Sequence, residues 1–262
     1  MRALSTAATG MAAQQLNVEV ISNNIANMNT VGYKKQQAEF QDLLYQTLAQ
    51  AGAQSSDQGT IVPTGVQVGA GVKTGSVYRI NTQGAMTATG NQYDLAINGR
   101  GFFQVLTPTG DIAYTRAGNF SVNDTGQLVT QDGYQVQPAI SIPQDATNVT
   151  ISQSGQVQVT QPGTPTPTVV GQIELASFMN EGGLSAQGGN LYLETGASGP
   201  PVTGVPGIQG LGTLTQGYTE ASNVDPVTEI TSLIVAQRAY EMNSKVISTA
   251  DSMLQVANQV KQ

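Results

Sequence analysis

The residue types that most often carry out catalysis are scarce in this sequence. The 262 residues include no Cys and no His, so thiolate nucleophiles, Cys-ligated zinc and the commonest general base near neutral pH are absent. Asp and Glu are scattered singly, without the ligand spacing of a calcium-binding loop. The sequence therefore predicts no enzyme, no metal site and no cofactor.

Two short motifs are similar to reactive or phosphate-binding sequences, but both have simpler interpretations. Asp-Thr-Gly at 124–126 matches the aspartic-protease motif, yet that chemistry needs two carboxylates that share a proton, and no second copy occurs. Gly-Arg-Gly at 99–101 is too short for a phosphate-binding loop and is followed by two Phe, where such a loop has Lys and a hydroxyl residue. The first motif is typical of a hairpin turn, and the second of a bend in a strand.

Charge and hydropathy limit the partners that we expect. The net charge is -7, and the ten Lys and Arg form no run that could neutralise several phosphates, so nucleic acid is not an expected partner. No stretch approaches eighteen consecutive apolar residues, and the N-terminal residues lack the apolar core of a signal peptide. We expect neither membrane insertion nor a cleaved signal peptide.

Heptad patterns at both ends predict the elements that frame the molecule. The N-terminal pattern runs from residue 4 to 28 and the C-terminal pattern from residue 233 to 257, which is typical of two helices that pair as in a coiled coil. The repeating apolar positions are Leu4, Met11, Val18 and Ile25 in the first helix, and Leu233, Tyr240, Ile247 and Leu254, with Asn243 between them, in the second.

The C-terminal helix carries a second apolar stripe, offset by two residues, or about 200° around the helix axis. Its main members are Val235, Met242, Val246 and Met253. One partner helix covers only one stripe, so the second must be buried in a single-chain core or against other subunits. The rest of the chain offers no surplus helices, which favours other subunits.

Four Asn gather where the first helix is expected to end: Asn23, Asn24, Asn27 and Asn29. Asn is a poor helix former, so the cluster requires a helix end or a polar interface. Asn29 is expected to help end the helix before Gly32. We expect Asn23, Asn24 and Asn27 to be buried between subunits, where paired amides fix the register.

The middle of the chain changes from a period of seven to a period of two. Alternation predicts hairpins at 95–106, 120–136 and 148–160, and Pro and Gly predict loops at 161–168 and 196–217. The predicted fold is α+β, with paired terminal helices flanking an inserted antiparallel β domain. The expected parts are an N-terminal helix (1–32), a connecting arm (33–75), a β-rich domain (76–216), and a return segment with the C-terminal helix (217–262).

Residues 46–72 follow neither period. They fit a disordered linker or an extended arm that lies on neighbouring subunits. Spaced apolar residues favour the arm, since a linker has little use for them: Ile61, Val62, Val66 and Val68.

Two long segments at opposite ends resemble a known family. ISNNIANMNTVGYKK at 21–35 is similar to the N-terminal signature of bacterial flagellar basal-body rod and hook proteins, and AQRAYEMNSKVISTADSMLQ at 236–255 is similar to their C-terminal signature. The segments that resemble the distal-rod members of this family include FQDLLYQT at 40–47, GAQSS at 52–56, AYTRAGNF at 113–120 and QGYTEASNV at 216–224. GAQSS favours distal rod over hook, because hook proteins generally lack such a segment.

The resemblance implies a structural subunit with no catalytic activity. Such subunits pass through the flagellar export apparatus and polymerise into a helical tube that crosses the periplasm as a drive shaft. The implied partners are further copies of the chain, proximal rod proteins, the hook protein and the ring proteins around the rod. Two alternatives stay open: a hook or proximal-rod subunit of the same family, and a secreted β-rich binding module.

Overall fold

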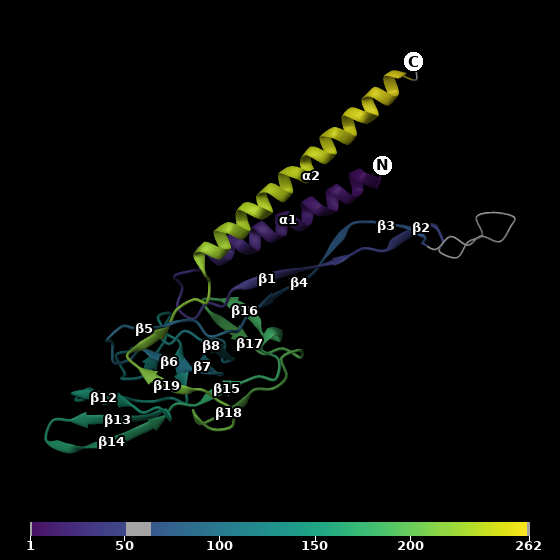
Figure 1. The fold of residues 1–262 in the computed structure, drawn as a ribbon. Helices are drawn as coiled ribbons and strands as arrows, with labels where there is room; N and C mark the ends of the chain where they lie inside the picture. Colours follow the sequence, from purple (N-terminus) through teal and green to yellow (C-terminus); the bar gives the residue numbers. More distant parts are fainter. Residues whose placement is uncertain (1, 51–63, 261–262) are drawn as a thin grey trace. The chain divides into compact units, whose positions relative to one another are not determined.

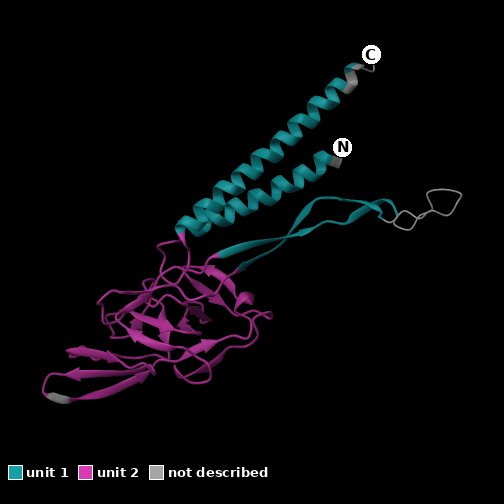
Figure 2. Cartoon of the chain, viewed as in Figure 1, with its two compact units in different colours: residues 1–25, 36–78, 226–262 teal, residues 26–35, 79–225 magenta. Residues whose placement is uncertain are grey.

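The structure is a computed structural model that describes residues 2–50 and 64–260. It confirms an α+β fold, in which α1 (Arg2–Ala26) and α2 (Pro226–Val260) flank a β-rich middle (Figure 1). The chain divides into two compact units (Figure 2). Unit 1 comprises residues 1–25, 36–78 and 226–262, and unit 2 comprises residues 26–35 and 79–225. The domain boundaries expected from the sequence stay predictions.

Unit 1 combines the two helices with an arm of two successive two-stranded sheets. β1 (Gln36–Asp42) pairs with β4 (Val72–Arg79), and β2 (Tyr45–Ala49) pairs with β3 (Val66–Gly69). Helix α1 contacts α2 so closely that a Cβ added at Gly10 would lie 2.9 Å from Nδ2 of Asn243. On the arm side, the backbone N–H of Val72 donates to Oγ1 of Thr9 at 3.4 Å. Adjacent residues of α1 thus meet different elements of unit 1.

Local sequence explains where α2 begins. Pro226 is its first residue, where the missing N–H costs no helical hydrogen bond. Glu229 lies in the first turn, near the positive end of the helix dipole.

Unit 2 is built around a nine-stranded sheet, with seven strands in the order β16-β17-β8-β7-β11-β10-β9 and β15 pairing with β7 and β18. The strands are β7 (Phe102–Leu106), β8 (Ile112–Thr115), β9 (Ser121–Val122), β10 (Leu128–Val129), β11 (Gln135–Gln137), β15 (Leu175–Ser177), β16 (Ser185–Gly188), β17 (Leu191–Leu193) and β18 (Val202–Gly204).

Smaller sheets complete unit 2. One has the order β12-β13-β14, and two pairs join β6 to β19 and β5 to β20. A short 3-10 helix spans Glu181–Gly183. The strands are β5 (Met86–Ala88), β6 (Leu95–Asn98), β12 (Asn148–Ile151), β13 (Gln156–Gln161), β14 (Thr164–Gln172), β19 (Thr213–Gln216) and β20 (Tyr218–Glu220).

Strand β7 divides the apolar core between the two faces of the nine-stranded sheet. Successive side chains of a strand point to opposite faces. Phe103 therefore joins the main cluster, where its ring centroid lies 5.0 Å from that of Phe120. Phe102 joins a smaller aromatic cluster and packs edge-to-face on Phe178 and Tyr192. Both faces of the sheet are thus filled within one chain.

The expected hairpins are confirmed in two of three places. β9 pairs with β10 and β10 with β11, and β12 pairs with β13 around Gly155, whose φ is 83°. The hairpin predicted at 95–106 is wrong, because β6 pairs with β19 and not with β7. Gly99 and Gly101 have φ of 116° and 134°, values that L side chains rarely adopt, and they turn the chain away between the two strands.

The two loops predicted from Pro and Gly are also partly wrong. The first shortens to a turn at Gly163, since β14 starts at Thr164 despite its prolines. β14 is an edge strand of its sheet, and edge strands tolerate proline because an N–H that faces solvent has no partner strand to bond. The second contains β18, which pairs with β15, and β19, which pairs with β6 far earlier in the sequence; local composition reveals neither pairing.

Candidate assembly surfaces and a buried charge cluster

The apolar residues of α2 have two different environments. Ala236 and Ala250 are buried, and Leu233, Asn243 and Ile247 are half-buried. The exposed residues of the second stripe, with their exposed fractions, are Val235 (63%), Met242 (62%), Val246 (46%) and Met253 (62%), and Tyr240 and Leu254 of the first stripe are exposed as well. Within the described residues, α2 therefore keeps an apolar stripe uncovered.

Helix α1 is buried on a wider face than the predicted seam. Leu4, Met11, Val18 and Ile25 are half-buried, whereas the fully buried apolar residues are Ala7, Ala13, Val20 and Ile21. Ala7 and Ile21 lie three residues after Leu4 and Val18, at the second apolar position of the heptad, whereas Ala13 and Val20 lie outside both heptad positions. Helix α1 contacts the arm at Thr9 as well as α2 at Gly10, and the heptad pattern alone contained no sign of the contact with the arm.

Asn24 joins three segments of unit 1. Its side chain is 1% exposed, and its Nδ2 donates to Oε2 of Glu229 on α2 at 3.1 Å and to the carbonyl of Gln36 at 2.8 Å. Its Oδ1 accepts the backbone N–H of Gln36 at 2.8 Å. The Asn24 amide thus forms hydrogen bonds both with the start of the arm and with the first turn of α2. This intrachain role was missed in the sequence analysis.

The other residues predicted at interfaces lie nearer the surface. Asn23 is exposed, and Asn27 is half-buried with its Oδ1 accepting the hydroxyl of Thr30 at 3.2 Å. Val66 and Val68 on β3 are exposed. Ile61 and Val62 lie outside the described residues, as does the GAQSS segment. Contact of these residues with other subunits stays a prediction.

Unit 2 contains a buried cluster of three charged side chains. Glu220 on β20 is 1% exposed; its Oε1 accepts from Nζ of Lys34 at 2.6 Å and its Oε2 accepts from Nε of Arg116 at 2.5 Å. Oε1 also accepts the backbone N–H of Gly84 at 2.8 Å. Arg116 donates further to the carbonyls of Ile97, Gly99 and Gly101. One carboxylate thus binds segments from three distant parts of the sequence.

The protonation of the cluster follows from burial and from neighbouring charge. Burial alone would raise the pKa of Glu220, but the charge of Arg116 and hydrogen bonds from Arg116 and Lys34 outweigh it and hold that pKa below the ordinary 4.5. Burial lowers the pKa of Lys34, more than the hydrogen bond and charge of Glu220 raise it. The cluster therefore favours the ionised form of Glu220, whereas burial disfavours the charged form of Lys34.

The sequence contains an indication of this cluster that the sequence analysis did not consider. Lys34, Arg116 and Glu220 each occur in a segment quoted for the family resemblance, in a chain with only 10% charged residues. Charged residues inside such motifs are candidates for buried pairing. Sequence alone gives no means of matching the three, because they lie far apart in the chain.

Two other kinds of site are absent from the part of the chain that the structure describes. No group of three or more His, Cys, Asp or Glu side chains there is placed to hold a metal ion. No described helix is long and apolar enough to span a membrane.

Family models match three regions of the chain. Residues 4–34 match the flagella basal body rod protein model, residues 96–159 match the D1 domain of the flagellar hook protein FlgE/F/G, and residues 215–260 match the flagellar basal body rod FlgEFG protein C-terminal model. The first and last regions contain Lys34 and Glu220, and the middle region contains Arg116. Each member of the buried cluster therefore lies in a region typical of the family.

Relatives of known family cover the whole chain. The flagellar basal-body rod protein FlgG of Caulobacter vibrioides is 68% identical over 100% of both chains, and that of Agrobacterium fabrum is 53% identical over 98% of both. The rod protein FlgF of Caulobacter vibrioides is 38% identical over 88% of this chain and 85% of its own length. Similarity of this extent establishes that the chain belongs to the family of flagellar basal-body rod proteins, and to its FlgG type.

Proposed function

We propose that the chain is a structural subunit of the distal rod, which polymerises into a rigid helical shaft that transmits motor torque to the hook. The uncovered stripe on α2 is the observation that supports this proposal most strongly. Val235, Met242, Val246 and Met253 each present between 46% and 63% of their surface to solvent. Burying the remaining surface of four such side chains would contribute roughly 3–6 kcal/mol per subunit.

Residues on the arm and near the end of α1 complete the proposed contacts. Exposed Val66 and Val68 on the arm would lie against neighbouring subunits, and Asn23 and Asn27 would fix the register between them. The proposed further partners are proximal rod proteins, the hook protein, the surrounding ring proteins and the export apparatus. The role is mechanical, and we propose no catalytic step and no cofactor.

Assembly of the purified full-length chain tests this proposal. We expect straight tubes of uniform diameter in electron micrographs. Val246→Glu puts a charge on the uncovered stripe and should abolish the tubes, because burying an unpaired carboxylate costs several kcal/mol. Ser248→Glu is the matched control: it adds the same charge two residues later, about 200° around the helix, and should assemble normally.

Three results would count against the proposal. A chain that stays monomeric at high concentration would contradict polymerisation. Equal assembly of V246E and S248E would contradict the role of the stripe. Curved tubes would favour a hook-type subunit over a rod-type one.

A further inference from the structure

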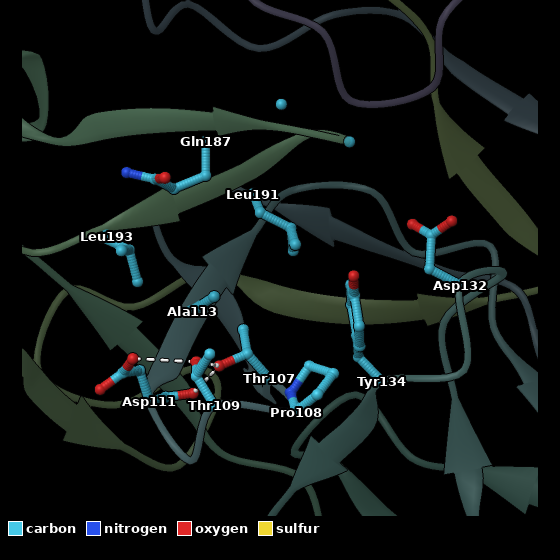
Figure 3. A pocket seen from close by; sticks show the side chains of 12 residues that line it. Thr107, Pro108, Thr109, Asp111, Ala113, Asp132, Tyr134, Gln187, Leu191 and Leu193 are labelled. Atoms are coloured by element: carbon cyan, nitrogen blue, oxygen red, sulfur yellow. Dashed lines mark hydrogen bonds between the residues drawn. The ribbon is translucent and has the colours of Figure 1, made fainter.

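A groove with a volume of about 510 Å³ opens on unit 2 (Figure 3). Half-buried Leu191 and Leu193 of β17 line it, together with Ala113 of β8, so part of the main core is reached from solvent here. Tyr134 stands at one side, and Figure 3 shows its hydroxyl and the carboxylate of Asp132 pointing in the same direction. None of the residues that line the groove belongs to the apolar stripe on α2 or to the buried charge cluster.

The polar groups around the groove have one sign of charge. Asp132 and Asp111 are both exposed, and Oδ2 of Asp111 accepts the hydroxyl of Thr109 at 2.9 Å, which holds this carboxylate in place. The lining residues include no Lys or Arg. An apolar floor, an aromatic ring and carboxylates together suit a side chain with an aliphatic stem and a cationic head.

The charges of unit 2 disfavour a second copy of this unit as the occupant. Its residues include five Lys and Arg against ten Asp and Glu. Four of these cations already contact acidic or aromatic groups of the same unit: Lys34 and Arg116 with Glu220, Arg100 with Glu181, and Arg79 with the ring of Tyr192. Another unit 2 would bring mainly further carboxylates to an acidic groove, which is repulsive.

We propose that this groove docks a Lys or Arg side chain on an extended segment of a different, basic protein. The aliphatic stem lies over Leu191 and Leu193, and the charged head lies between the ring of Tyr134 and the carboxylate of Asp132. This docking site is independent of polymerisation, which the stripe on α2 controls. The two proposals can therefore fail separately.

Fluorescence anisotropy with a labelled, capped Val-Arg-Val-Arg-Val peptide tests the groove at physiological salt. The V246E chain serves as the base protein, since it keeps the groove lining and is expected to stay free of tubes. A peptide with citrulline in place of Arg keeps the shape and removes the charge. We expect the Arg peptide to bind about tenfold more tightly than the citrulline peptide.

Substitutions then locate the binding. Tyr134→Leu and Asp132→Asn should each weaken binding of the Arg peptide about three- to tenfold. Asp124→Asn is the matched control for charge, because Asp124 is exposed and does not line the groove, and it should leave binding unchanged. Unfolding midpoints verify that the variants fold. Equal loss in D132N and D124N, or equal binding of the two peptides, overturns the proposal.

Discussion

The two units bury different kinds of side chain. The main cluster of unit 2 includes Phe, Leu and Ile residues with no exposed surface, such as Phe103, Leu95 and Ile97. The fully buried apolar side chains of unit 1 are mostly small, with Ala7, Ala13, Ala236 and Ala250 among them, while several of its larger apolar residues, such as Met242 and Met253, are exposed. Unit 2 therefore buries its large apolar side chains within one chain, whereas unit 1 leaves more of them uncovered.

Among the substitutions that test this difference between the units, Glu220→Gln is expected to have the largest effect, which is a loss of stability in unit 2. Removing the carboxylate leaves Lys34 and Arg116 buried without a counter-charge, which should destabilise unit 2 by about 3–5 kcal/mol. Urea unfolding followed by near-UV circular dichroism measures the loss. Glu181→Gln is the control: it breaks an ion pair with Arg100, whose side chain is 65% exposed, and should cost less than about 1 kcal/mol. Equal losses of unfolding free energy in the two variants would show that the buried ion pairs stabilise unit 2 no more than an exposed pair does.

A smaller effect is expected in unit 1 from Asn24→Leu. The substitution removes the hydrogen bonds that the Asn24 amide makes with the carboxylate of Glu229 and with the backbone of Gln36, at a cost of about 1–3 kcal/mol. Thermal unfolding of helical circular dichroism measures it. Asn27→Leu provides the comparison, because Asn27 is half-buried and its change should leave the monomer nearly unaffected while damaging tube formation. If N24L unfolds like the unmodified chain, Asn24 does not join the three segments in solution.

The smallest effect, and the one confined to acid, is the pH dependence of unit 2. The pKa of Glu220 is lower in the folded chain than in the unfolded chain, so its stabilisation is complete above the ordinary value of 4.5 and is lost as the pH falls through the folded value. The slope from this group is at most about 1.4 kcal/mol per pH unit. Unfolding free energies measured from pH 5 downward, as far as the chain stays folded, should show this slope. The E220Q variant should lack it. A slope unchanged in E220Q would assign the acid sensitivity to other carboxylates.

Local patterns predicted those parts of the fold that neighbouring residues determine. Heptads located both helices, and turns centred on glycines such as Gly155 located the hairpins. The pairing of β6 with β19 joins residues more than a hundred positions apart, and nothing in either segment specifies the other. The same limit applies to the charge cluster. The intrachain role of Asn24 was also missed, because an Asn cluster is compatible with burial inside or between chains.

The position of Glu220 and β19 late in the sequence has a consequence for the order of folding. Strand β6 has its sheet partner, and Lys34 and Arg116 have their counter-charge, only when residues 213–220 are present. A chain that is synthesised, or threaded through a channel, from its N-terminus first therefore holds an incomplete unit 2 until most of its length has emerged. The last segment of the β-rich part therefore completes unit 2.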